Sequence, residues 1–354
     1  MSAVDGPVSD EANTGPAPLH CRSAKNFLPN LIQRLNHSPN FAPVPGFHAY
    51  LIHPKQLKPP MKSPLIIASC IFAALAAQAF AYSDDGHMYV AKIAYDRLPP
   101  AKQKKLDELM ALIKNGRAPY NSASAACWPD DVKHTPGFGP TADWHFIDMP
   151  LNGGPLPTKA NILDGIKKNL ADYRTAASAP STPANKLKQA RAIAFLIHLV
   201  GDIHQPLHCS EPGGSTGGNA IQVANARPPG NLHHFWDGAY GVSFDRTSGK
   251  AIVPGNGARP ATAKATAFAD RTRAIMVGHA PGPLWNSNGQ DYRAWANQTF
   301  AIAKRDAYGP LAVHGPPYAP VMLSEAYVNK ARDITDRRVT LAGYRLAKLL
   351  DSLL

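Results

Sequence analysis

Residues 198–208 restrict the fold of this chain more than any other segment, because they contain three histidines and one aspartate. His198 and Asp202 are four residues apart, so both side chains leave the same face of a helix. The apolar run that precedes them predicts that this helix is buried. Pro206 predicts that it ends just before that residue, since the residue ahead of a proline avoids helical geometry. His208 then folds back toward His198 and Asp202.

This grouping of imidazole and carboxylate side chains is typical of a metal site. Zinc prefers four ligands in tetrahedral geometry, and nitrogen and oxygen donors suit it. The alternative is a helix end whose histidines are hydrogen-bonded and structural, a reading that suits one histidine better than three. We interpret residues 198–208 as part of a zinc site.

The same residue types recur in four other short segments. These are residues 82–87 (YSDDGH), 127–133 (CWPDDVK), 143–148 (DWHFID) and 231–237 (NLHHFWD), the last with a second His-x3-Asp pair at helical spacing. Eight of the fourteen histidines lie between His87 and His234. One mononuclear site cannot use so many, which indicates a cluster of several zinc ions.

In this order and spacing the motifs resemble the zinc-dependent single-strand-specific nuclease family, of the mung bean nuclease type. That family shares a superfamily with the zinc-dependent phospholipases C. Its pattern is an N-terminal Trp-Gly-x-x-Gly-His, then Trp-Ala-Asp, Trp-His-(Phe/Tyr), His-x3-Asp-x5-His and Asn-Leu-His-x3-Asp. The resemblance runs from Tyr82 to the C-terminal AGYRLAKLLDSLL. Two positions depart from the pattern: Tyr82 stands where the family has Trp, and Lys133 where it commonly has Arg.

The resemblance implies three zinc ions. The first is bound by Asp130, His145, His198 and Asp202, the second by His87, Asp202 and the backbone amine and carbonyl of Tyr82, and the third by His208, His233 and Asp237. The amine of Tyr82 must be free for this role, whereas its side chain affects only packing. His134, His204, His234, His279 and His314 have no matching role, and His204 and His234 are either supporting or structural.

The resemblance also implies residues that act on the substrate. Asp130 orients the attacking water, Lys133 binds phosphate as a point charge without the bidentate fork of Arg, and Asn219 lies close to the scissile phosphate. Phe146 and Asp148 form a base pocket. A ring on which a base stacks favours unpaired nucleotides. The alternatives are a plain turn at Asn219, a core position for Phe146 and a capping role for Asp148.

The activity implied is that of a zinc-dependent endonuclease and 3′-nucleotidase. It hydrolyses phosphodiester bonds of single-stranded DNA and RNA to 5′-phosphorylated products, by attack of a metal-bound hydroxide on phosphorus. A phospholipase C-type phosphodiesterase is the alternative, but those enzymes usually carry Glu in the final His-x3 pair, where this chain has Asp237. A non-catalytic zinc-binding protein would have a broken ligand set, and here every position is filled.

Residues 61–81 read as a secretory signal peptide, with Lys62, an apolar core from Leu65 to Leu75 and Ala79-Phe-Ala81 as a cleavage site. The apolar stretch is shorter than the ~20 residues of a membrane-spanning helix. Cleavage after Ala81 makes Tyr82 the first residue of a secreted or periplasmic protein. Residues 1–60, with ten prolines and no apolar periodicity, are either not translated or a disordered extension.

Residues 82–354 are long enough for one sizeable core. They carry 31 Lys and Arg against 22 Asp and Glu, a balance that suits a polyanionic substrate without identifying it. Their two cysteines, Cys127 and Cys209, each adjoin a ligand motif, so in an exported protein we expect a disulfide; two buried thiols are the alternative. We expect no stable protein partner, no membrane association after removal of the signal peptide, and a monomer.

The fold class predicted is all-α, a mainly helical single domain with long loops around the three-zinc site and little or no β structure. Helical patterns follow His87 and Pro100, the latter closed by Gly116, and recur near residues 159–176, 184–204, 260–277, 292–306 and 324–353. Residues 220–224 are the one candidate for a short strand.

Overall fold

The computed structural model describes residues 82–114, 119–226, 230–241, 243–245, 250–252, 262–280, 289–313 and 315–354. All of them belong to one compact unit, Ala73–Leu354. The α-helices within these residues are α1 (Asp84–Tyr95), α2 (Pro100–Met110), α3 (Trp128–Val132), α4 (Ile162–Ser178), α5 (Pro183–Asp202), α6 (Leu232–Asp237), α7 (Thr262–Gly278), α8 (Tyr292–Ile302) and α9 (Glu325–Leu353). Short 3-10 helices include η1 (Ser124–Cys127), η2 (Gly139–His145) and η3 (Pro206–Cys209). The all-α prediction is confirmed.

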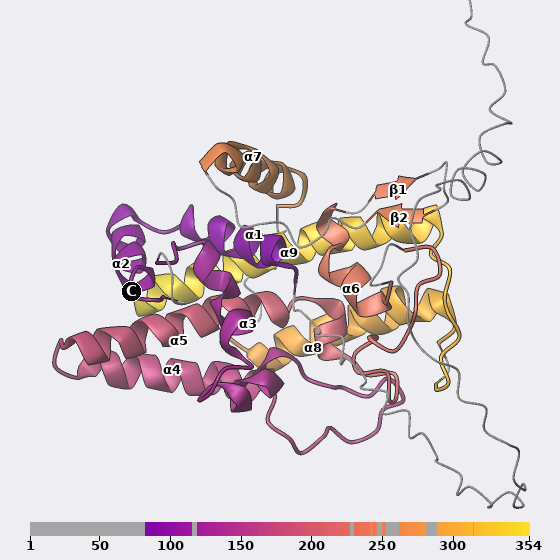
Figure 1. Cartoon of the computed structure of the whole chain (residues 1–354), viewed down its shortest axis with the longest axis horizontal. Coiled ribbons are helices and arrows are strands. Elements are labelled where there is room, and N and C mark those ends of the chain that lie inside the picture. Colours follow the sequence, from indigo (N-terminus) through magenta and orange to yellow (C-terminus); the bar gives the residue numbers. More distant parts are fainter. Residues whose placement is uncertain are drawn as a thin grey trace, which may run out of the picture. The chain divides into compact units, whose positions relative to one another are not determined.

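Helices α4 and α5 form an antiparallel pair that lies side by side in Figure 1. A capping box starts α4, where Asn161 Oδ1 accepts from Leu163 N and Asp164 Oδ2 accepts from Asn161 N. Helix α5 begins with Thr182 as N-cap and Pro183 at its first position. Its last thirteen residues are almost entirely buried, as the apolar run predicted.

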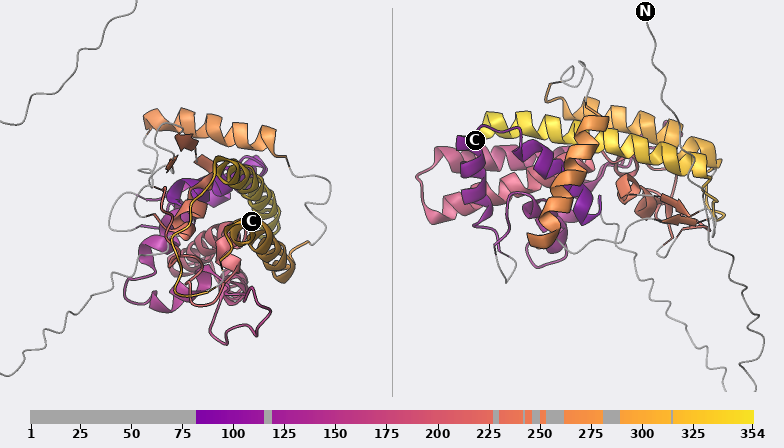
Figure 2. Two further views of the ribbon diagram at one scale, coloured as in Figure 1. Left: turned by 90° about the vertical axis from the view of Figure 1, so that its right-hand side faces the viewer. Right: turned by 90° about the horizontal axis from the view of Figure 1, so that it is seen from above.

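The long helix α9 packs along α1 and also contacts α5 and α7 (Figure 2). Its C-terminal end lies beside α2, where Lys102 Nζ forms an ion pair with Asp351 at 2.7 Å. These helices share the larger apolar core. A second apolar cluster surrounds α6, where Trp236 Nε1 donates to Tyr327 OH at 3.0 Å. The histidines and aspartates singled out in the sequence lie near the ends of helices and on the short turns next to them.

The β structure among the described residues is minor. Strands β1 (Ser243–Asp245) and β2 (Lys250–Ile252) pair antiparallel, with Ser243 opposite Ile252. The predicted strand at 220–224 is reduced to isolated bridges at Gln222 and Val223. Of the described helices, none combines the length and the apolar composition that crossing a membrane requires.

Helix boundaries differ from the predicted ones in three places. Helix α2 ends at Met110 instead of near residue 115, and the predicted cap Gly116 lies outside the described residues. Helix α8 ends at Ile302 and continues as a π-helix, Ala303–Tyr308. Helix α5 ends at Asp202, because His204 N donates to Gly201 O and Gln205 N donates to Asp202 O in a tighter turn. Asp202 is therefore the last helical residue ahead of η3.

Candidate metal centre

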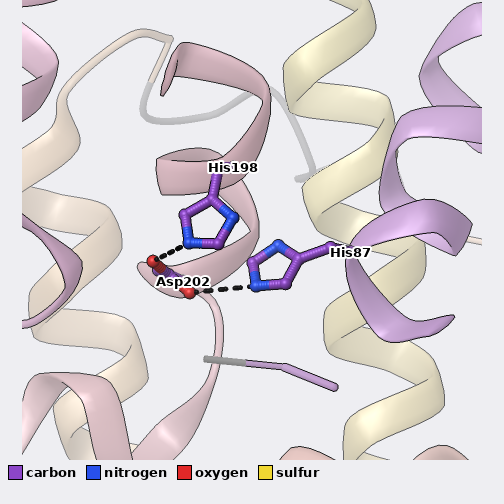
Figure 3. A group of neighbouring side chains, drawn as sticks. All are labelled: His87, His198 and Asp202. Atoms are coloured by element: carbon purple, nitrogen blue, oxygen red, sulfur yellow. Dashed lines mark ion pairs between the residues drawn. The ribbon is translucent and has the colours of Figure 1, made fainter. Parts of the chain in front are cut away.

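Asp202 and His198 lie on the last turn of α5, and His87 on α1 faces them (Figure 3). His198 Nε2 is 3.1 Å from Asp202 Oδ2, and His87 Nε2 is 3.3 Å from Asp202 Oδ1. The rings of His87 and His198 are stacked with centroids 3.9 Å apart. All three side chains are at most 1% exposed. The helical spacing thus brings His198 and Asp202 together, and α1 adds the third group.

A second group joins the first through His198. Asp130 on α3 and His145 at the end of η2 approach it from segments far away in sequence. His145 Nδ1 lies 2.8 Å from His198 Nε2 and 3.4 Å from Asp130 Oδ1. It is also 3.2 Å from Asp202 Oδ2. These four side chains therefore point at one common space.

A third group consists of His208 on η3 with His233 and Asp237 on α6. His233 Nε2 and His208 Nε2 are 3.1 Å apart, and Asp237 Oδ1 is 3.7 Å from His233 Nε2. His208 Nδ1 lies 3.6 Å from Asp202 Oδ1, which links this group to the first. Each of the three groups brings its ligand atoms within 4.8 Å of one another, close enough to hold a metal ion.

Backbone carbonyls fix the orientation of three of these imidazoles. His198 Nδ1 donates to Ala126 O at 2.6 Å, His208 Nδ1 to His145 O at 2.7 Å, and His233 Nδ1 to Gly217 O at 2.7 Å. A hydrogen on Nδ1 leaves the lone pair on Nε2, which is the atom turned toward the centre. Metal-ligating histidines are usually held in this way.

Several buried polar atoms at the centre have no hydrogen-bond partner within the described residues. They are both ring nitrogens of His87, His145 Nε2, both carboxylate oxygens of Asp202, and Asp237 Oδ2. Buried polar groups are almost always hydrogen-bonded. This many unpartnered polar atoms in one place therefore require another partner. Metal ions supply it, and the nitrogen and oxygen donors fit zinc.

The electrostatics of the centre favour protonation states that bind metal. Burial lowers the pKa of His87 to about 4, and it also lowers the pKa of His208 and of His233. Burial alone would raise the pKa of Asp202, but His198 and His208 hold it well below its usual value. Neutral imidazoles and an ionised carboxylate are the forms that coordinate metal.

Two residues of the centre shift in the opposite sense. Burial lowers the pKa of His198, but the carboxylates of Asp202 and Asp130 outweigh it and raise the pKa to about 9. Burial raises the pKa of Asp237 to about 8. Both shifts follow from the cost of a buried carboxylate charge, which a proton on His198 offsets and a proton on Asp237 removes.

Lys133 and Asn219 lie at the edge of this arrangement. Lys133 is only 5% exposed, and its Nζ is 2.8 Å from Asp130 Oδ1. Burial raises the pKa of the Asp130 carboxyl, but His198 and Lys133 outweigh burial and hold that pKa below its usual range. Asn219 Nδ2 donates to Thr216 O at 2.7 Å, which agrees with the turn considered as the alternative for this residue.

Phe146 and Asp148 follow His145 directly, and a lysine that sequence reasoning missed lies against both. Lys159 Nζ is 4.5 Å from the centroid of the Phe146 ring and 3.0 Å from Asp148 Oδ2. Burial raises the pKa of Asp148, and Lys159 opposes that shift. No local sequence pattern predicts these contacts of Lys159, because Lys159 meets Phe146 and Asp148 only in the folded structure.

His204 and Tyr82 are buried residues next to the segments that carry the centre. His204 Nδ1 donates to Val200 O at 2.7 Å, and Arg345 Nη1 donates to His204 Nε2 at 2.9 Å. Both nitrogens of His204 are thereby used, and its role is structural. Tyr82 is fully buried, its hydroxyl donates to His204 O at 3.3 Å, and its ring lies edge-on to His87. His234 is only partly buried and donates its backbone N–H to Asn231 Oδ1.

The structure does not show the expected disulfide between Cys127 and Cys209, and both side chains are buried. Cys127 Sγ donates to Asp84 O at 3.6 Å, whereas Cys209 Sγ donates to Ile203 O at 3.5 Å. The two sulfur atoms therefore point at the backbone of different segments, although each cysteine adjoins a residue of the centre.

Comparison with known proteins gives matches over most of the chain. The family model described as S1/P1 Nuclease matches residues 82–354. Endonuclease 4 of Arabidopsis thaliana is 26% identical over 77% of this chain and 89% of that protein. Nuclease S1 of Aspergillus oryzae is 24% identical over 81% of this chain and 96% of its own length. Endonuclease 2 of Arabidopsis thaliana is 30% identical, but that match covers 44% of this chain and only 54% of the relative.

The close approach of α1 to α5 at Gly201 allows a direct test of the geometry. A Cβ at this position would lie 2.8 Å from His87 Nδ1, and His87 cannot retreat because it stacks on His198. We expect Gly201→Ala to lower the free energy of unfolding by about 1–3 kcal/mol, as overpacking does, and to reduce bound metal. Urea unfolding and elemental analysis measure both.

The matched control is Gly278→Ala, because Gly278 is also helical but has no atom within 4 Å of its would-be Cβ. Stability and metal content of Gly201→Ala equal to those of the control would contradict the observed packing of His87 on α5.

Proposed function

Because the chain belongs to the S1/P1 nuclease family, we propose that it is a zinc-dependent endonuclease and 3′-nucleotidase. It hydrolyses single-stranded DNA and RNA to 5′-phosphorylated products. The observation that carries this proposal is the set of three His/Asp groups linked through His198 and Asp202. The unpartnered buried atoms of that set need cations as partners.

We assign three zinc ions to these groups. The first is held by Asp130, His145, His198 and Asp202, the second by His87, Asp202 and the backbone of Tyr82, and the third by His208, His233 and Asp237. Support comes from the short distances within each group. Ser83 N donates to the backbone oxygen of Asp237 at 3.1 Å, so the first described residues adjoin the third group.

Zinc held by these residues would supply a water of lowered pKa and would neutralise charge that develops on the phosphate. Asp130 would accept a hydrogen bond from the attacking water and orient its oxygen toward phosphorus. Lys133 sits within 2.8 Å of Asp130, and its ammonium attracts a phosphate oxygen as a point charge. The bond from phosphorus to the 3′ oxygen breaks, and that oxygen takes up a proton as it leaves. Asn219 lies in the turn that also carries Gly217, the backbone partner of His233.

The base next to the scissile phosphate stacks on Phe146 and meets the carboxylate of Asp148 at its polar edge. The ring is partly exposed, as a stacking surface must be. Lys159 lies on the ring and pairs with Asp148, so a base entering this place displaces the lysine. A paired base cannot present its face, and single strands are therefore preferred.

Export completes the centre, because the amine of Tyr82 becomes free only after cleavage of residues 61–81 as a signal peptide. The match to the family model begins at residue 82, and the burial of Tyr82 against His87 agrees with a fixed position for this residue. The mature protein is then secreted or periplasmic. Residues 1–81 themselves lie outside the described residues.

A substrate panel tests the proposed function. The zinc-loaded protein should cleave single-stranded DNA and RNA much faster than duplex DNA, and release phosphate from a 3′-nucleotide. Chelation should abolish these activities, and added zinc should restore them. Phosphatidylcholine serves as the control for a phospholipase C. Hydrolysis that persists after removal of all metal, or phosphatidylcholine as the better substrate, would overturn the proposal.

The base pocket has its own test in Phe146→Ala. Because stacking of a base on an aromatic ring contributes roughly 1–3 kcal/mol, single-strand cleavage should slow by about 5- to 150-fold. Zinc content should not change, since the ring ligates nothing, and Phe146→Tyr should retain most activity. If Phe146→Ala leaves both the single-strand rate and its ratio to the duplex rate unaltered, Phe146 is a packing residue only.

A further inference from the structure

A second concave site, distinct in its lining from the three metal groups, lies between α4, α5 and residues 137–144. Its volume is about 560 Å³, within the range of small-molecule sites. Figure 1 shows α4 and α5, whose residues line part of the cavity, side by side. None of the proposed zinc ligands lines the cavity. The function proposed above therefore does not use it.

One wall of the cavity is aromatic and rigid. It is made by Phe138, Trp144 and Phe195. The rings of Trp144 and Phe195 meet edge to face, with their centroids 5.5 Å apart. Trp144 is pressed against α4, because a Cβ at Gly165 would lie 2.7 Å from Trp144 Cβ. Such a wall is preformed for a flat ligand, since little side-chain freedom is lost when the ligand binds.

The floor of the cavity carries a polar group available to a ligand. Asn169 is only 4% exposed, and its Nδ2 donates to Gly165 O at 2.8 Å. No described residue donates a hydrogen bond to its carbonyl oxygen, so an N–H group of a ligand in the cavity can donate to it.

Two cations stand at the rim. Lys188 and Arg191 are exposed side chains that line the cavity, and neither forms an ion pair with another described residue. The Arg191 guanidinium lies 5.7 Å from the centroid of the Phe138 ring. The one carboxylate in the lining, Asp172, pairs with Lys168 at 2.8 Å. The rim is thus positive next to an aromatic wall.

We propose that this cavity binds one nucleotide of a single-stranded nucleic acid, at a distance from the bond that is cut. The base lies against the aromatic wall with an N–H directed at Asn169, and the phosphates meet Lys188 and Arg191. Aromatic faces beside a positive groove are the features by which proteins hold single strands. The inference rests on the proposed function, because it makes this site an extension of the substrate path.

The cavity adjoins the metal centre through two chain neighbours. Trp144 precedes His145, and Phe195 lies three residues before His198 on α5, which is about 4.5 Å along a helix axis. A long strand can therefore occupy both places, whereas a dinucleotide fills only the metal centre.

Steady-state kinetics on two substrate lengths test the proposal. In the zinc-loaded Lys188→Gln/Arg191→Gln protein, KM for a 20-nucleotide single strand should rise about tenfold, or about 1.4 kcal/mol, with kcat unchanged. The kcat/KM for a dinucleotide should stay within about twofold of wild type. The control is Lys186→Gln/Arg174→Gln, which removes the same charge from exposed positions of α5 and α4 outside the cavity. Equal KM values for the two double variants would overturn the proposal, as would an equal loss on the dinucleotide.

A binding measurement separates this inference from the proposed function. Fluorescence anisotropy of a labelled phosphorothioate 20-mer should show weaker binding to Lys188→Gln/Arg191→Gln than to the control variant. If the wild type binds this probe through the cavity but cleaves no nucleic acid, the proposed activity fails and the cavity site stands. If it cleaves single strands and both double variants bind the probe alike, the activity stands and the cavity site is overturned.

Discussion

The carboxylate of Asp202 is fully buried, and the rest of the centre depends on how that charge is stabilised. Taking a carboxylate out of water costs several kcal/mol unless cations or hydrogen bonds replace the solvent. Neither oxygen of Asp202 has a hydrogen-bond partner among the described residues, while ring nitrogens of His87, His145, His198 and His208 approach within 3.6 Å. Metal ions between these groups satisfy the oxygens and the nitrogens together, which explains why one aspartate links all three groups.

Helices and turns contribute to the centre in different ways. Helix α5 provides a rigid, apolar support that carries His198 and Asp202 into the interior. The irregular segments η1, η2 and the turn at Gly217 provide backbone carbonyls that orient the imidazoles. Arg338 supports the end of α5, since its Nε donates to His204 O at 3.1 Å. The same helix that positions the centre also forms, with α4, one side of the second cavity.

The sequence predicts what is local in the chain. The four-residue spacings of His198 with Asp202 and of His233 with Asp237 fix their common faces, and both pairs meet as expected. The resemblance to a family brought in Asp130, His145 and His87, which spacing alone does not join. Lys159 escaped because its contact with Phe146 arises from tertiary folding. The expected disulfide is not shown, and closeness in sequence to a centre does not predict the direction of a sulfur atom. The π-helix after α8 left no periodic signal either.

The zinc content of Asp202→Asn measures the central claim most directly. Asparagine keeps the shape of the side chain but removes the charge that links the three groups, so the fold should survive while metal is lost. Elemental analysis should find about three zinc ions per wild-type chain, fewer in the variant, and helical circular dichroism unchanged between them. Three zinc ions retained by Asp202→Asn, at the same free zinc concentration as wild type, would contradict the account.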